Sequence, residues 1–129
     1  MSVLAKLYYG GDGVEEDYGK AFHYALKAAE AGSASGQAFL GRLYGAGEGT
    51  AKDEEKAFYW AEKSAAQDNV DGIVILAVCY EMGYGVDMDD DKAYDLFCRA
   101  ESREDEITYY FQEDYDYLLD CYYDYDLWR

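Results

Sequence analysis

The chain holds a single histidine, no proline and few basic residues. With His23 alone, a serine or cysteine triad lacks its base unless another group substitutes, and a histidine-based metal site has too few ligands. The absence of proline leaves helices free of the ring that would break them. We therefore expect no enzyme activity, no cofactor and no metal ion.

Basic side chains are outnumbered, with 11 lysine and arginine residues against 28 aspartate and glutamate residues and a net charge of -17. Binding to nucleic-acid phosphates or to an anionic membrane surface needs clustered lysine and arginine, so we expect neither. An excess of carboxylates favours fast, steered association with a basic protein partner. The charge also has a simpler interpretation, in which it only keeps the protein in solution.

Cysteines are few and odd in number: Cys79, Cys98 and Cys121. Such a set does not form a disulfide framework and is typical of a reducing compartment. No apolar run approaches the length of a membrane span, and no apolar stretch with a basic flank opens the chain. We expect a cytoplasmic protein, or a periplasmic one if a signal peptide has been removed.

What the sequence does contain is a repeat, in which the same residue types recur 36 positions apart without a gap. A period of roughly 20–50 residues is the signature of a solenoid. We expect three units, at about residues 1–32, 33–68 and 69–101, followed by a segment, 102–129, that the repeat does not cover. Recurring positions include Leu4, Leu40 and Leu76; Gly11, Gly47 and Gly83; Asp17, Asp53 and Asp89; and Ala21, Ala57 and Ala93.

Each unit predicts a helix, a glycine loop and a second helix. In the second unit, apolar residues three and four positions apart predict a first helix over about 35–46. Gly47 lies where a left-handed residue closes such a helix. Asp53 then lies at the N-cap of a second helix that runs to about Gln67, with Ala57 on its packing face.

This pattern resembles the Sel-1-like repeat family, which is related to the tetratricopeptide repeats. Leu40-Gly41-Arg42-Leu43-Tyr44 matches the family's first-helix core, Gly83-Tyr84-Gly85-Val86 its loop, and the segment 56–65 its second helix. The resemblance covers roughly residues 1–101. It implies an all-α fold, a right-handed α/α superhelix (solenoid) of three helix–loop–helix repeats, acting as an adaptor or scaffold in protein–protein contacts. Some bacterial immunity proteins that neutralise secreted toxins also look like this.

In related repeats the first helices line the concave face, so positions that vary there between units are candidates for partner binding. One such slot holds Lys6, Arg42 and Val78, and the next holds Tyr9, Gly45 and Glu81. From these we select Lys6, Tyr9, Arg42 and Glu81 as candidate partner-binding residues. Neutral drift on a surface explains the variation equally well.

The segment 102–129 is rich in aspartate and tyrosine, and two compatible interpretations apply to it. As a structural element, it predicts a helix from Glu104 to about Tyr122 that caps the solenoid, with Ile107, Phe111, Leu118 and Leu119 facing inward. One helical face cannot bury every ring, and tyrosine and tryptophan are favoured at protein interfaces. The candidate partner-binding residues here are Tyr115, Asp116, Tyr117, Tyr122, Tyr123, Asp124, Tyr125 and Trp128.

Together these features predict a non-catalytic protein–protein interaction module. The sharper hypothesis is a small bacterial immunity or inhibitor protein that sequesters a basic toxin or enzyme. One alternative is a generic adaptor in signalling or regulation. Another is an acidic surface that mimics nucleic acid and occupies a nuclease or a DNA-binding protein. Self-association into a homo-oligomer stays open, because solenoid ends and exposed aromatic rings are adhesive.

Overall fold

The computed structural model describes the backbone of residues 17–128 and the side chains of residues 17–122. This part of the chain is helical and contains no strand. Its elements are α2 (Tyr18–Glu30), α3 (Ala34–Ala46), α4 (Glu54–Ala66), α5 (Val70–Met82), α6 (Asp90–Glu101), the short 3-10 helices η1 (Glu104–Glu106) and η2 (Tyr109–Phe111), and α7 (Gln112–Trp128).

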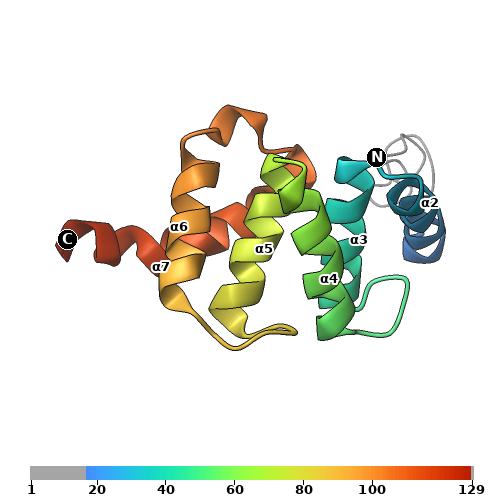
Figure 1. Ribbon diagram of the computed structural model, residues 1–129, viewed down its shortest axis with the longest axis horizontal. Coiled ribbons are helices and arrows are strands. Elements are labelled where there is room, and N and C mark those ends of the chain that lie inside the picture. Colours follow the sequence, from blue (N-terminus) through green and yellow to red (C-terminus); the bar gives the residue numbers. More distant parts are fainter. Residues whose placement is uncertain (1–16, 129) are drawn as a thin grey trace.

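The helices stack in chain order, and each lies beside the next. Figure 1 shows α3, α4, α5 and α6 side by side, with α2 against α3. The helices α3 and α4 form one pair and α5 and α6 the next, while α2 is the second helix of the preceding pair. The expected all-α solenoid is confirmed.

Aspartate caps begin the second helix of every repeat, as the sequence predicts. Asp17, Asp53 and Asp89 have extended backbones, and each side chain accepts a hydrogen bond from the backbone N–H three residues later. The bonds measure 3.0–3.1 Å. Each cap satisfies one of the backbone donors that a helix start leaves without an intrahelical partner.

The glycine loops fix both a turn and the distance between repeats. Gly47 and Gly83 end α3 and α5 in the left-handed region, with φ of 70° and 73°. Gly85, also at positive φ, lies against the start of α4: a Cβ atom added there would stand 2.6 Å from the carbonyl oxygen of Glu54. Glycine is therefore required at this position for two reasons, the backbone angle and the close approach of the preceding repeat.

A recurring aromatic contact joins each repeat to the next. A ring on one second helix meets, edge to face, the tyrosine on the first helix of the following unit. The pairs are Phe22 with Tyr44, at 5.3 Å between ring centroids, and Phe58 with Tyr80, at 5.7 Å. At the end of the array Tyr94 meets Tyr122 of α7 at 5.3 Å, so α7 supplies the ring that a fourth unit would have supplied.

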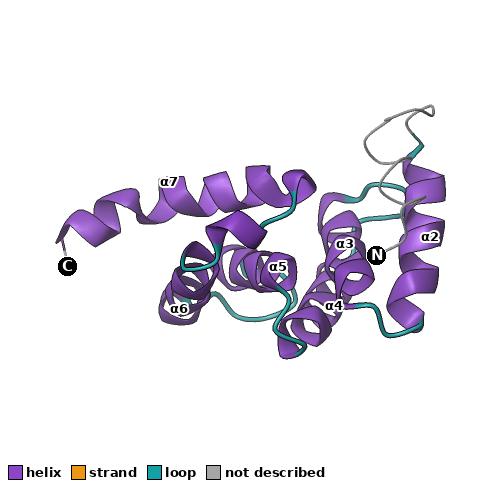
Figure 2. Ribbon diagram, turned by 90° about the horizontal axis from the view of Figure 1, so that it is seen from above, coloured by secondary structure: helices purple, strands orange, loops and turns teal. Residues whose placement is uncertain are grey.

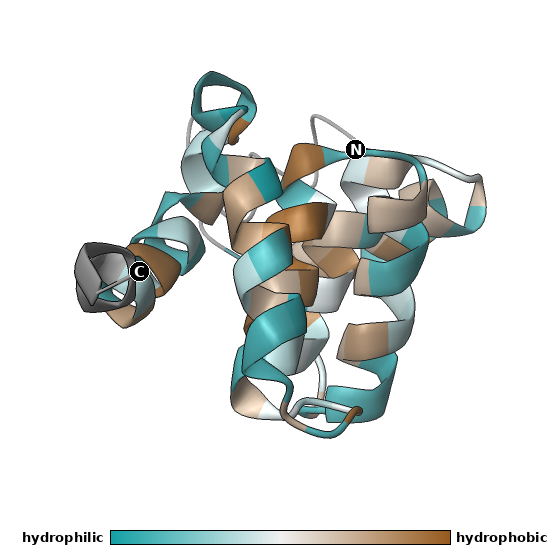
Figure 3. Cartoon of the chain, turned by 60° about the vertical axis from the view of Figure 1, so that its left-hand side comes forward, coloured by the Kyte–Doolittle hydropathy of each residue, from teal (hydrophilic) through white to brown (hydrophobic). Residues whose placement is uncertain are grey.

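Small residues let the helices approach and large ones fill the space between them. Ala21, Ala57 and Ala93 are fully buried at equivalent positions of the three second helices. Phe39 and Ile73 are fully buried on first helices. Figure 3 shows apolar residues gathered where helices face one another and hydrophilic residues on the outer sides. The core is therefore a strip that runs along the stack, as the repeat pattern predicts.

The segment after α6 departs from the single helix predicted from Glu104. Two 3-10 turns come first, and the α-helix begins only at Gln112 and continues to Trp128. Ile107 and Thr108 between the turns are extended. The prediction of one helix from Glu104 to about Tyr122 is therefore wrong at both ends. At its start, the residues before Gln112 form the crossing from α6 towards α3. The inward positions of Ile107, Phe111 and Leu118 are confirmed, while Leu119 is only partly buried.

Candidate functional site

The C-terminal segment lies across the stack and contacts three of its helices. Figure 2 shows α7 as a separate layer above α5 and α6, with its first turn near α3. The ring of Phe39 on α3 meets the rings of Tyr110 and Phe111, at 6.3 and 6.0 Å between centroids. The first helices that were expected to form an open concave face therefore carry the chain's own C-terminal segment.

A buried carboxylate anchors the start of this segment. Asp71, in the first turn of α5, is 4% exposed. It accepts hydrogen bonds from the backbone N–H of Thr108, at 2.9 Å, and from the Thr108 hydroxyl, at 2.5 Å. A buried carboxylate needs such donors, so the extended link between η1 and η2 is held at this point.

Arg42 is bound within the chain. Its guanidinium donates to the carboxylate of Asp114 on α7, with side-chain exposures of 13% and 22%. Burial raises the pKa of the Asp114 carboxyl, and the nearby charge of Arg42 opposes that rise. The expectation that Arg42 faces a partner is corrected: the side chain pairs with α7 because α7 covers this part of α3.

Tyr115 and Tyr122 were expected at a partner surface, and their burial corrects that expectation. Their exposures are 1% and 5%. Both pack on Phe97 of α6, with centroids 5.8 and 5.3 Å away. The Tyr122 hydroxyl donates to the carboxylate of Glu81 at 2.6 Å, so Glu81 too is bound within the chain. These rings are internal because the last repeat presents an aromatic surface that has no further repeat to cover it.

Asp116 and Tyr117 stay exposed on α7, and Tyr117 has 40% of its surface accessible. The side chains of Tyr123, Asp124, Tyr125 and Trp128 lie outside the described residues, as do Lys6 and Tyr9. The backbone of the last turns of α7 projects beyond α6 in Figures 1 and 2. Whether these residues bind a partner stays a prediction.

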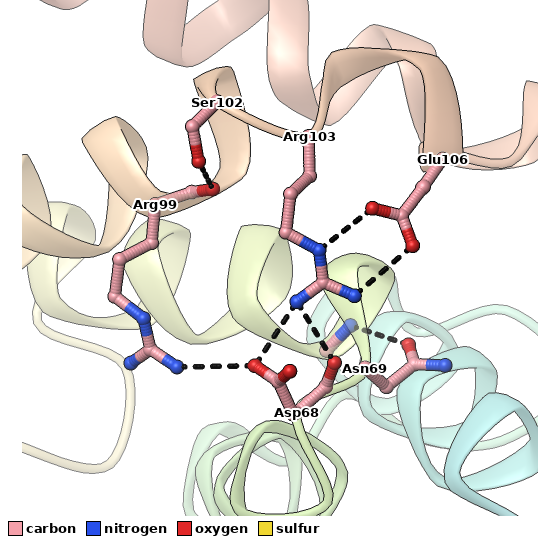
Figure 4. Close-up of polar contacts among 7 residues, drawn as sticks. Asp68, Asn69, Arg99, Ser102, Arg103 and Glu106 are labelled. Atoms are coloured by element: carbon pink, nitrogen blue, oxygen red, sulfur yellow. Dashed lines mark hydrogen bonds and ion pairs between the residues drawn. The ribbon is translucent and has the colours of Figure 1, made fainter.

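A cluster of charged residues that the sequence analysis did not single out ties α6 and η1 to the loop before α5 (Figure 4). Asp68, with a left-handed φ of 60°, accepts from Arg103 at 3.0 Å and from Arg99 at 3.5 Å. Arg103 also donates to Glu106 at 2.8 and 3.1 Å, which lowers the pKa of that carboxyl. The signal for it was the arginine at position 99, where the other repeats have Lys27 and Lys63.

The histidine and cysteine side chains of the described part differ from one another in character and surroundings. Among the side chains of residues 17–122, no cluster of three or more histidine, cysteine and acidic groups is placed to hold a metal ion. His23 is exposed on α2. Cys79 is buried, and burial raises the pKa of its thiol to about 12, which keeps the thiol protonated and unreactive at neutral pH. None of the helices in this part has the length and apolarity to cross a membrane.

Comparison with known families identifies the repeats. A model of the family described as Sel1 repeat matches residues 1–33, 34–69 and 71–105. The chain belongs to the Sel1 repeat family. Sel1 repeats are modules of protein–protein interaction. The match ends at residue 105, so η2 and α7 lie beyond the third Sel1 repeat.

Solved structures of Sel1 repeat proteins share this fold. A protective antigen present in uropathogenic Escherichia coli strains has a TM-score of 0.71 and 31% identity over 78% of this chain and 22% of its own. A Sel1 repeat protein from Oxalobacter formigenes has a TM-score of 0.67 and 31% identity over 78% and 41%. Cysteine rich protein B of Helicobacter pylori has a TM-score of 0.56 and 34% identity over 63% and 61%.

The chain thus spans less than two thirds of the length of each of these Sel1 repeat structures. A search of curated proteins finds no match to the chain.

Proposed function

We propose that this Sel1 repeat chain is a non-catalytic protein-binding module whose partner is a basic protein. The observation that carries the proposal is the acidic outer side of α7, where Glu113, Asp116 and Asp120 are exposed. Glu113 is 92% exposed and stands 3.9 Å from Arg42, which is already bound to Asp114. Such a surface attracts lysine and arginine on a partner and speeds the encounter.

Most cationic side chains in the described part of the chain make contacts within it, and the 11 basic residues are too few to balance the 28 acidic ones. Arg42, Arg99 and Arg103 form the ion pairs given above. Several lysines lie over the chain's own aromatic rings, where the negative face of the ring attracts the ammonium group. These are Lys52 over Tyr84, Lys56 over Tyr44, Lys63 over Tyr59 and Lys92 over Tyr80.

Within this class, the chain acts as a small inhibitor or immunity protein that sequesters a basic toxin or enzyme. A strongly acidic protein that meets its target by electrostatic steering neutralises it quickly, which is what an inhibitor of a toxic enzyme needs. The thiols of Cys79, Cys98 and Cys121 are all free, which fits a reducing compartment such as the cytoplasm.

The test uses three full-length baits in the source cell extract, at low and at high salt. One is the natural chain, and one carries Glu113→Gln, Asp116→Asn and Asp120→Asn on α7. The matched control carries Glu55→Gln, Glu62→Gln and Asp95→Asn, which remove as many charges from exposed positions of α4 and α6. We expect one basic protein, identified by mass spectrometry, that the natural and control baits retain at low salt and the α7 variant loses.

The same experiment separates the alternatives. A captured enzyme whose activity falls on binding supports inhibition, and one that stays active supports an adaptor. A nucleic-acid-binding partner that DNA displaces supports nucleic-acid mimicry. A partner held equally by all three baits and insensitive to salt contradicts the proposal, because exposed charge pairs weaken as salt screens them.

A further inference from the structure

A hollow of about 190 Å³ opens between α3, α5 and α7. Gly41, Gly45 and Ala46 form its wall on α3, and Val78 and Cys79 lie on the α5 side. Helix interfaces are normally close-packed, so an apolar hollow of this size between them is uncommon. It is large enough for a bulky side chain, since an apolar cavity of about 150 Å³ takes up benzene.

Gly45 creates much of this space. The equivalent slot of the third repeat holds Glu81, a much larger residue, whose carboxylate accepts a hydrogen bond from Tyr122. A Cβ atom added at Gly45 would lie 3.7 Å from the Cβ of Ala57 and 3.8 Å from the ring of Tyr84, which are ordinary contact distances. A larger residue therefore fits at position 45, and the backbone of α3 does not require glycine there.

The wall on α7 is charged, which distinguishes this hollow from an ordinary packing defect. Asp114 and Arg42 both line it. Burial raises the pKa of the Asp114 carboxyl, and the negative charges of Glu113 and Glu48 raise it further, against the opposing effect of Arg42. Glu113, 92% exposed and 3.9 Å from Arg42, supplies a carboxylate beside this end of the hollow that a cation of a partner can reach.

Apolar side chains extend from the hollow to the surface. Met82, which lines it, is 43% exposed. Tyr117 is 40% exposed and lies three residues after Asp114, on the same side of α7. A flexible methionine and a rigid tyrosine beside a concave apolar site are features of protein-binding surfaces.

We propose that this composite hollow accepts one large apolar side chain from a basic segment of a partner protein, while the exposed carboxylate of Glu113, beside the lining residues Arg42 and Asp114, binds a lysine or arginine that flanks it. The inference rests on the proposed function, because it takes the partner to be basic. It adds the point of attachment: the hollow lies between the second and third repeats, and Asp114 of α7 lines one side of it.

The probe is a fluorescein-labelled peptide with one tryptophan between arginines, and binding is measured by fluorescence anisotropy with the full chain. Two control peptides replace the tryptophan by alanine or the arginines by glutamine. Gly45→Leu fills the hollow from α3. The matched control is Ala66→Leu, which adds the same side chain at an exposed position at the end of α4.

We expect the tryptophan–arginine peptide to bind, and Gly45→Leu to weaken it at least about tenfold, since one buried apolar side chain contributes at least that much. Ala66→Leu should leave it unchanged, and both control peptides should bind more weakly. If circular dichroism shows that Gly45→Leu is misfolded, Val78→Phe fills the same space from α5.

Binding that survives both Gly45→Leu and the loss of tryptophan overturns the inference and leaves a basic partner in place. Binding that needs the tryptophan but not the arginines supports the hollow and contradicts the basic partner of the proposed function. The absence of binding by every peptide overturns the inference, while the capture experiment still tests the proposed function by itself.

Discussion

Arg42 on α3 donates to the carboxylate of Asp114 on α7, and this ion pair joins the second repeat to the C-terminal helix across 72 positions of sequence. Both side chains are largely shielded from water, with exposures of 13% and 22%. Shielded pairs are screened little by salt, and removal of one partner leaves the other with an uncompensated charge.

Asp114→Ala is therefore expected to lower the free energy of unfolding by about 1–3 kcal/mol, as for other hydrogen bonds between charged groups. Urea unfolding followed by circular dichroism measures it. The control is the neighbouring change Glu113→Ala, which removes an exposed carboxylate 3.9 Å from Arg42 and should change stability by under about 0.5 kcal/mol. The double variant Arg42→Ala with Asp114→Ala should lose less than the sum of the single losses. Strict additivity would show that the two side chains do not interact.

Tyr122 combines a hydrogen bond with packing, and two substitutions separate them. Tyr122→Phe removes the bond to Glu81 and should lower the stability of the docked helix by about 1 kcal/mol. Tyr122→Ala also removes the ring from Phe97 and Tyr94 and should lower it by about 3–5 kcal/mol. Amide hydrogen exchange in α7 measures both effects. Equal exchange rates in the two variants would mean that the ring contributes nothing beyond its hydroxyl.

The tyrosines of α7 predict a loss of stability in alkali. Burial raises the pKa of Tyr117 from about 10 to about 12, and burial also raises the pKa of Tyr115 and Tyr122. Above pH 10 the unfolded chain loses these protons before the folded chain does, so the folded state binds more protons and stability falls as pH rises. Urea midpoints should begin to fall near pH 9, where the unfolded chain loses the Cys79 proton before the folded chain does, and should fall more steeply between pH 10 and 12, where the tyrosines add to the effect. Tyr117→Phe should flatten this decline, and a midpoint that rises with pH would contradict the sign.

Gly85 offers a test of the close contact between repeats. Gly85→Ala places a Cβ atom against the Glu54 carbonyl oxygen and also strains a backbone at φ 70°. Gly32→Ala is the matched control, since Gly32 has φ 93° and nothing within 4 Å of the added atom. The control should lose about 1 kcal/mol from backbone strain alone, and Gly85→Ala should lose clearly more. Chemical denaturation compares them, and equal losses would show that α4 moves aside at no cost.

The repeats could be predicted from sequence because the same capping and loop residues recur in each of the three units. Asp53 caps a helix and Gly83 ends one by interactions within a few residues, so the pattern alone identifies them. The path of the C-terminal segment could not be predicted in this way. It depends on Thr108 meeting Asp71, a pair 37 positions apart with no counterpart in another repeat.

The sequence predicts only half of the buried face of this segment, with Phe111 and Leu118 facing inward, and it favours a partner surface for Tyr115 and Tyr122, which are buried on the same face. Phe111, Tyr115, Leu118 and Tyr122 are spaced four, three and four positions apart, which is the spacing of a single buried face. Tyrosine is common both in cores and at interfaces, so residue type did not decide between them. These tyrosines are buried because they pack on Phe97 of α6, and this contact is visible only in the folded chain.

The long reach of the C-terminal segment changes how this solenoid should come apart. In a simple array each unit touches only its neighbours, so terminal units can melt one at a time. Here Asp114 is tied to Arg42 and Thr108 to Asp71, so the third repeat cannot fray while α7 remains attached to the second. The C-terminal half should therefore unfold in a single cooperative step and fold more slowly than a simple array, because a distant loop must close first. Unfolding of a single unit by itself is then expected only at the N-terminal end of the stack, where α2 lies.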